Sequence, residues 1–307
     1  MRRTPIAVTA VSVLLSLSLV GCAKDPSEAQ QGGGGGETTT QQQNTALHDK
    51  LPDKIKQSGK LVSVNSGSFP PYEIVGSNRD LSGAAADLSD ALGQVLGIKV
   101  EHVTVEGLSG VLTGIKAGRY DFALGPIGDF PERETDNDFV DWVQEFVVFA
   151  VPKGNPKQIK DLDSTCGLRV AVMAAGSAEK VIKEQAQKCT AAGKPALEVQ
   201  SYKDQPSSIL AVKSGRADAF FSSQAPLTYF VKQSNGELEL AATGQKNGFD
   251  DLFQGAVVPK DSALRDVLLA ALQELYDNGT YAKIMAKWGL DGNKLDKPGI
   301  NLAGGKG

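Results

Sequence analysis

The sequence predicts an α/β protein in which two lobes are joined by two strands. Short β-like runs alternate with helical stretches from residue 51 onward, in the strand–helix–strand order of a parallel sheet covered by helices. This series occurs twice along the 307 residues, a length that suits two domains. Apolar runs near residues 147–151 and 253–258 mark two crossings. Lobes joined in this way can hinge about a cleft, and ligands bind such sheets at the carboxyl ends of their strands.

The first series belongs to lobe I. Its first helix has apolar residues at helical spacing, among them Leu88, Leu92 and Val95, and Gly118 ends its second helix. The expected elements are, in order, a strand over 61–64, a helix over 84–96, a strand over 100–105, a helix over 108–117 and a strand over 121–124.

The second series follows the first crossing, and the chain then returns to lobe I. After the return, Asp261 or Ser262 can cap a long helix that Gly279 closes, and Thr280 can cap a short final helix to Trp288. The expected elements before the return are strands over 168–173, 197–202, 219–221 and 238–242, and helices over 178–188, 207–214 and 226–233.

The N-terminus has the features of an export signal. Arg2 and Arg3 precede an apolar stretch over residues 6–20, which is too short to cross a membrane comfortably. The stretch leads to Cys22 in an arrangement that resembles a bacterial lipobox, in which the cysteine thiol is acylated. The alternative is a plain signal peptide with a chance cysteine. We predict a signal peptide over 1–21 and lipidation at Cys22, with a lipid anchor as the only attachment to the membrane.

The sequence after Cys22 is polar and rich in glycine, without large apolar side chains up to residue 45, which is typical of a flexible tether. The residues after 290 are rich in Gly, Lys and Asp, which indicates a loose tail. The predicted divisions are a lipidated tether over 22–48, lobe I over 49–149 and 254–292, lobe II over 150–253, and a loose tail over 293–307.

Two cysteines remain in the body, Cys166 and Cys189. An even pair in an exported domain predicts a disulfide, and the alternative is two buried free thiols. The loop that the bond would close is worth about 3 kcal/mol in the chain-entropy description.

Composition excludes several classes of function. Lys and Arg total 32 and Asp and Glu total 36, so the net charge of −4 argues against a nucleic-acid binder. Two histidines and three cysteines cannot build a His-rich metal site or a four-cysteine zinc cluster. The sequence shows neither a Ser-His-Asp set nor a P-loop, so we expect no catalysis, no cofactor and no metal.

Short strings lie in order along the body: GKLV at 59–62, FPPYE at 69–73, LSG at 81–83 with DL at 87–88, GRYD at 118–121, ER at 132–133 with VDW at 140–142, SGRADA at 214–219, and DNGTY at 277–281 with KWG at 287–289. Together they resemble the extracytoplasmic solute-binding proteins of ABC importers, in particular the polar amino-acid family. The resemblance covers about residues 51–290. It implies a type II periplasmic-binding fold, whose lobes close on a ligand.

The resemblance implies that Arg133 binds a carboxylate of the solute with its guanidinium, whereas the local sequence alone favours a solvated arginine paired with an acid such as Glu132. Gly125 and Gly128, in the loop before it, let the backbone approach a ligand closely. Ser177 resembles the family's second carboxylate contact at the start of a lobe II helix, and a plain N-cap is the alternative.

Two positions where the family places an acid for the ammonium group carry other residues. Ser223, followed by Gln224, stands where the lobe II acid is usual, and the loop that ends at Ser68 replaces the family's first acidic stretch. Since an unpaired buried ammonium is unfavourable, three alternatives follow. Another acid, Asp129 or Asp204, supplies the charge; or Ser223 and Gln224 suffice with backbone carbonyls; or the solute is not an ordinary α-amino acid.

By resemblance, the chain is a lipid-anchored, extracytoplasmic and monomeric receptor that passes a small polar solute, an amino acid or a derivative, to an ABC permease and its ATPase. Phe69 is then the aromatic lid over the solute, with a role in the core as the alternative. Two other functions stay open: a ligand-binding surface sensor lipoprotein, and a receptor for a solute that is not an amino acid.

Overall fold

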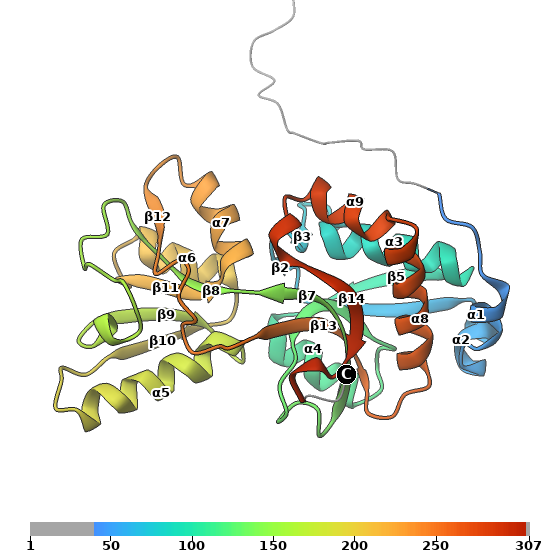
Figure 1. The fold of residues 1–307 in the computed structure, drawn as a ribbon, viewed down its shortest axis with the longest axis horizontal. Coiled ribbons are helices and arrows are strands. Elements are labelled where there is room, and N and C mark those ends of the chain that lie inside the picture. Colours follow the sequence, from blue (N-terminus) through green and yellow to red (C-terminus); the bar gives the residue numbers. More distant parts are fainter. Residues whose placement is uncertain (1–39, 305–307) are drawn as a thin grey trace, which may run out of the picture. The chain divides into compact units, whose positions relative to one another are not determined.

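The computed structural model describes residues 40–304, which form two α/β lobes joined at two crossings (Figure 1). Lobe I contains both ends of the described chain, and lobe II lies between the crossings. The two-lobed α/β architecture expected from the sequence is therefore confirmed.

Lobe I consists of α1 (Thr45–Asp49), α2 (Asp53–Ser58), β1 (Lys60–Asn65), β2 (Ser68–Phe69), β3 (Glu73–Val75), β4 (Leu81–Ser82), α3 (Ala84–Leu96), β5 (Lys99–Thr104), α4 (Gly107–Lys116), β6 (Ala123–Gly128), β7 (Asn137–Glu145), β13 (Leu252–Pro259), α8 (Leu264–Asp277), α9 (Thr280–Lys287), η2 (Asp291–Asn293), β14 (Lys294–Ile300) and η3 (Leu302–Gly304). β5 pairs in parallel with β1, and a bridge between Ser63 and Phe122 links β1 to the start of β6. The sheet continues through β13 and β7 to β14. Helices α3, α8 and α9 pack on it around the buried Trp142.

Lobe II consists of β8 (Val147–Pro152), η1 (Asp163–Thr165), β9 (Arg169–Met173), α5 (Ser177–Ala191), β10 (Glu198–Tyr202), α6 (Gln205–Lys213), β11 (Ala219–Ser223), α7 (Gln224–Gln233) and β12 (Leu238–Ala241). Its sheet has the strand order β10-β9-β11-β8-β12, in which β8 is antiparallel to both of its neighbours. Separate apolar clusters lie on the two faces of this sheet.

The crossings lie slightly earlier in the chain than the sequence predicts. β7 belongs to the lobe I sheet and β8 to the lobe II sheet, so the chain leaves lobe I at Phe146. Residues 147–149, expected in lobe I, therefore belong to lobe II. The return lies between β12 and β13, which places residues 252–253 in lobe I.

The tether predicted over 22–48 ends before residue 44. The side chain of Asn44 accepts a hydrogen bond from the backbone N–H of Leu47 at 3.2 Å and so caps α1. Leu47 is buried in the core of lobe I, and Asn44 Nδ2 donates to Glu274 of α8. The prediction was wrong here because one cap and one apolar residue fix a short helix. The predicted signal peptide and Cys22 lie outside the described residues.

The loose tail predicted over 293–307 is also wrong, as far as residue 304. β14 pairs antiparallel with β7, although Lys294 and Gly299 are separated by a register shift. The backbone N–H of Phe139 donates to Asn301 Oδ1 at 2.8 Å, and Asn301 Nδ2 donates to Asp138 at 3.2 Å. Hydrogen bonds rather than an apolar face hold this segment, which is why its sequence gave no strand pattern.

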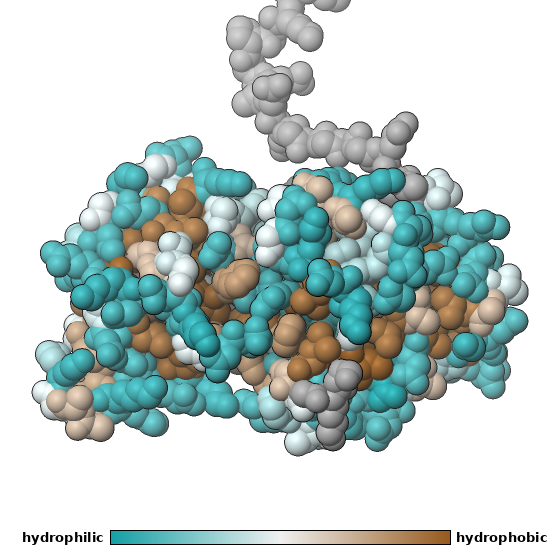
Figure 2. Space-filling view, in the orientation of Figure 1, coloured by the Kyte–Doolittle hydropathy of each residue, from teal (hydrophilic) through white to brown (hydrophobic). Residues whose placement is uncertain are grey.

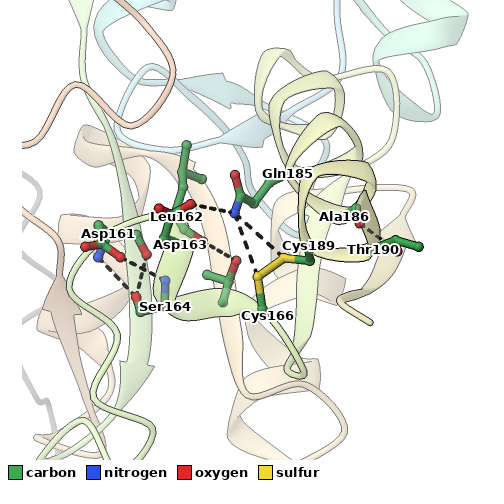
Figure 3. Close-up of a disulfide and its surroundings, with 10 residues drawn as sticks. Asp161, Leu162, Asp163, Ser164, Cys166, Gln185, Ala186, Cys189 and Thr190 are labelled. Carbon is green, nitrogen blue, oxygen red and sulfur yellow. Dashed lines mark hydrogen bonds between the residues drawn. A yellow bond between two sulfur atoms is a disulfide. The ribbon is translucent and has the colours of Figure 1, made fainter. Parts of the chain in front are cut away.

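The predicted disulfide between Cys166 and Cys189 is confirmed (Figure 3), with a Cα–Cα distance of 5.6 Å. It joins the segment after η1 to the second half of α5. Gln185 Nε2 lies 3.7 Å from the Cys189 sulfur and donates to Asp163 at 3.1 Å. The bond therefore fixes the helix whose other end faces lobe I.

Replacing both Cys166 and Cys189 by serine should lower the free energy of unfolding by about 3 kcal/mol, because the unfolded chain gains the freedom of an open loop. Urea unfolding followed by circular dichroism measures the change, and a reducing agent should reproduce it in the unsubstituted protein. An unchanged midpoint under reducing conditions would contradict the expectation.

Hydrophilic residues cover most of the face seen in Figure 2. Of the described residues, Phe146 at the crossing and Leu210 of α6 are the exposed large hydrophobic ones. Within residues 40–304, no helix is both long enough and apolar enough to cross a membrane.

Candidate functional site

A small cavity of about 50 Å³ lies between the lobes. The lobes are closed against each other, since the Arg133 guanidinium of lobe I donates to the carbonyl of Ala175 in lobe II. The ends of β1 and β6 contribute to it from lobe I, as the rule for strand ends predicts, and the start of α5 and the end of β11 contribute from lobe II. The lining residues are Asn65, Ser66, Phe69, Glu73, Leu108, Val111, Pro126, Ile127, Gly128, Val147, Met173, Gly176, Ser177, Ala178, Gln205, Ser222, Ser223 and Gln254.

The structure brings part of the predicted ligand set together. The predicted residues that line the cavity are Phe69, Gly128, Ser177 and Ser223. Those that lie around it without lining it are Ser68, Gly125, Asp129, Arg133 and Gln224.

The local surroundings of three of these residues differ from those of a ligand contact. Gly125 has a φ of +75°, and a Cβ there would lie 2.5 Å from the backbone nitrogen of Ile127, so the turn requires glycine. The backbone N–H of Gln224, at the start of α7, donates to the carbonyl of Phe146 at the crossing. The hydroxyl of Ser68 is buried without a hydrogen-bond partner.

Helix α5 points its N-terminus into the cavity. Gly176 is the N-cap, and no side chain caps this end, so Ser177 is the first helical residue and not the plain N-cap of the alternative interpretation. The N–H groups of a first helical turn have no partner within the helix, and the helix dipole places partial positive charge there. Gly176, Ser177 and Ala178 all line the cavity. This end of the cavity therefore suits a carboxylate.

Gly128 of lobe I lies close to Ser177 of lobe II in the cavity. A Cβ built on Gly128 would lie 2.6 Å from Ser177 Oγ and 2.7 Å from the ring of Phe130. A side chain at this position would require Ser177 and Phe130 to move in the closed arrangement.

Gly128→Ala should weaken solute binding at least about ten-fold, because the added methyl group meets Ser177 only when the lobes close, and a clash worth 1.4 kcal/mol suffices. Adding Ser177→Ala removes the opposing oxygen and should restore part of the loss. Isothermal titration of the single and double variants measures the coupling. Additive losses would show that the two residues do not meet in the closed form.

Arg133 crosses from lobe I to lobe II. Its guanidinium donates to the carbonyl of Gly128 at 2.7 Å and to the carbonyl of Ala175 in lobe II at 2.6 Å, and it lies over the ring of Phe130 at 5.0 Å. Burial lowers its pKa to about 10, which leaves it charged at neutral pH. Arg133 is thus not the solvated arginine of the local interpretation. It stands behind Gly128 at the edge of the cavity.

Two lysine–glutamate pairs join the lobes at the surface. Lys180 of α5 lies 2.8 Å from Glu132, and Lys203 forms an ion pair with Glu106. Their side chains are largely exposed, so each contributes little, and both are weakened by salt.

Neither acid suggested from the sequence as an ammonium partner lines the cavity. Asp204 caps α6 by accepting from the backbone N–H of Ser207 at 2.7 Å. Asp129 accepts from the backbone N–H of Ala303 at 3.0 Å and lies beside Glu134 and Asp141. Burial and the neighbouring Asp129 carboxyl raise the pKa of both Glu134 and Asp141.

The hinge contains a buried carboxyl, Glu145, at the end of β7. Tyr72 donates its hydroxyl to Glu145 Oε1 at 2.5 Å, while Glu145 Oε2 accepts from the backbone N–H of Phe146 at 3.3 Å. The backbone N–H of Ala225, in the first turn of α7, also donates to Oε2 at 3.5 Å. Burial raises the pKa of Glu145 to about 7. One side chain thus contacts both lobes at the crossing.

The sequence did not identify Asn65, Glu73 or Gln254 as cavity residues, although all three line it and are nearly fully buried. Asn65 ends β1, where the strand-end rule points, and Glu73 follows the Pro-Pro-Tyr turn. Gln254 lies in β13, just after the second crossing, where the sequence indicated only an apolar run. Within residues 40–304, no cluster of His, Cys, Asp and Glu forms a candidate metal site.

The profile of the bacterial extracellular solute-binding proteins, family 3, matches residues 61–291. The arginine-binding protein ArgT of Corynebacterium glutamicum is 28% identical over 301 residues, which are 96% of this chain and 95% of that protein. The L-cystine-binding protein TcyJ of Escherichia coli is 26% identical over 242 residues, 78% of this chain and 85% of TcyJ.

Solved structures share the fold. An ancestral arginine-binding protein bound to arginine superposes with a TM-score of 0.68 at 27% identity, over 75% of this chain and 98% of that one. This similarity confirms the type II periplasmic-binding fold that the sequence strings implied.

Proposed function

Because the chain belongs to the bacterial extracellular solute-binding proteins, family 3, we propose that it is an amino-acid receptor of an ABC importer. The observation that carries the proposal is the cavity between the closed lobes, where polar side chains from both lobes surround the start of α5. Enclosed sites with a few convergent polar groups suit small polar solutes. Relatives named for arginine and L-cystine support an amino acid as the solute.

The carboxylate of the amino acid binds at the start of α5. Ser177 and the free N–H groups of the first turn supply donors, and Arg133 supplies positive charge from behind Gly128. Phe69 covers the solute from lobe I. Ser223 contributes a hydroxyl from lobe II.

The transport cycle follows from lobe closure. The solute stabilises the closed form because it contacts both lobes only there. The closed receptor then docks on a membrane permease, whose ATPase drives uptake. The acylated Cys22 holds the receptor at the membrane, and the polar residues after it allow the body to reach the permease. The cavity is complete within one chain, so a monomer suffices.

A thermal-shift screen tests the proposal. The purified protein is heated with each of the twenty standard L-amino acids, with L-ornithine and L-citrulline, and with sugars and oligopeptides for comparison. A ligand at 100 times its Kd adds about 2.7 kcal/mol, which raises the Tm by a few degrees. We expect the shift to be confined to one class of amino acids. A shift only with sugars or peptides, or none at all, would overturn the amino-acid assignment.

A further inference from the structure

Glu73 brings a carboxyl group to the cavity. It is the first residue of β3, it is 6% exposed, and it lines the cavity from lobe I. Ser66 and Gly67, in the loop that follows β1, lie beside its carboxyl and favour its charged form, although burial outweighs their effect on its pKa.

Glu73 is the single ionisable side chain among the described residues that line the cavity. None of the described residues that line the cavity is a lysine, an arginine or a histidine. Burial raises its pKa to about 8. A buried carboxylate without a counter-charge is unfavourable, so at neutral pH most molecules hold a proton on Glu73.

Two other lining side chains offer unused polar atoms. Gln254 Oε1 and Asn65 Nδ2 have no hydrogen-bond partner, although each residue is only 2% exposed. Buried polar atoms are rarely left without a partner. The Gln254 oxygen is an acceptor, and together with the Glu73 carboxyl it provides what an ammonium or a guanidinium group needs.

We infer that Glu73 binds the positively charged group of the solute in this cleft. The inference rests on the proposed function, and it assigns to lobe I the counter-charge that Ser223 does not provide on lobe II. When the solute binds, the carboxyl O–H bond breaks and its proton passes to the solvent. The resulting carboxylate pairs with an N–H group of the solute, which is either the α-ammonium or a cationic side chain.

Isothermal titration with L-arginine and L-citrulline tests this role. The two amino acids have nearly the same shape and the same α-groups, but only arginine has a charged side chain. Titrations at pH 7 in phosphate and in Tris, whose ionisation enthalpies differ, count the protons released. We expect close to one proton per bound solute. Release with both amino acids assigns the α-ammonium to Glu73, and release with arginine alone assigns the guanidinium.

The variant Glu73→Gln keeps the size of the side chain and removes its charge. It should abolish proton release and weaken binding at least ten-fold, whereas the control Glu101→Gln, on the exposed face of β5, should change neither. Glu73→Asp keeps the carboxyl and should still release a proton on binding. This variant tests the role of the carboxyl if Glu73→Gln lowers the Tm of the unliganded protein. Unchanged affinity and unchanged proton release in Glu73→Gln would overturn the inference alone. Failure of the unsubstituted protein to bind any amino acid in the screen would overturn the proposed function itself.

Discussion

Ending the chain after Asn293 should lower the free energy of unfolding by about 4 kcal/mol or more, since hydrogen bonds to charged or buried acidic groups are worth about 1.5–3 kcal/mol each. The truncation removes β14 and η3. The backbone N–H groups of Leu302 and Ala303 then no longer donate to Asp141, at 3.1 Å, and to Asp129, at 3.0 Å. Both aspartates are at most 1% exposed and would be left without these donors.

Urea unfolding of the chain ended at residue 293 and of the full chain measures this loss. The matched control ends after residue 304 and keeps β14 and η3, so it should unfold at the midpoint of the full chain. Asn301→Ala provides an intermediate step, because it removes only the side-chain bonds to Phe139 and Asp138. Equal midpoints for the chain ended at 293 and the full chain would show that the C-terminal strand contributes nothing to lobe I.

Arg133→Ala should weaken binding of the amino acid about 100-fold, or about 3 kcal/mol, because two charge-assisted hydrogen bonds are lost, one of which joins the lobes. The bonds run from one guanidinium to Gly128 in lobe I and to Ala175 in lobe II. The variant also removes positive charge from the carboxylate end of the cavity. Isothermal titration measures the affinity.

The control for Arg133 is Arg119→Ala, which removes an exposed arginine of the same lobe and should leave the affinity unchanged. Arg133→Lys keeps the charge but lacks the planar group that bonds to two carbonyls at once. Its affinity for the amino acid should therefore lie between that of the unsubstituted protein and that of Arg133→Ala. If Arg133→Ala binds like the unsubstituted protein, neither lobe contact nor charge at this position contributes to closure.

Local patterns predicted the regular elements well. The helix expected over 84–96 is α3 with the same bounds, because its apolar face is continuous and glycine stands at both ends. β7 was not predicted as a strand, although it lies at the centre of lobe I. Both of its faces are buried and it carries Asp138, Asp141 and Glu145, so neither alternation nor an unbroken apolar run marks it.

The candidate site could be predicted only in part. Gly128 and Ser177, which the resemblance named as ligand residues, line the cavity. The resemblance did not show that Arg133 occupies carbonyls of both lobes, which depends on how the lobes close. Glu73 and Gln254 are 181 residues apart in the sequence and line one cavity from β3 and β13, which are strands of two different sheets. Such a contact leaves no local signal.

The hinge carboxyl makes the stability of this receptor depend on pH. Glu145 has a pKa of about 7 in the folded chain against 4.5 for the free group. The folded state therefore binds more protons than the unfolded state between these values, and its advantage falls as pH rises through that window. The contribution, about 3 kcal/mol at 1.36 kcal/mol per pKa unit, is complete below pH 4.5 and is lost above pH 7. The free energy of unfolding in urea should fall between pH 5 and pH 8, and most of this amount should be missing from the fall in Glu145→Gln. An equal fall in the two proteins would contradict the expectation. Proton uptake at one buried glutamate at the crossing would then make the folded receptor gain stability as the medium turns acidic.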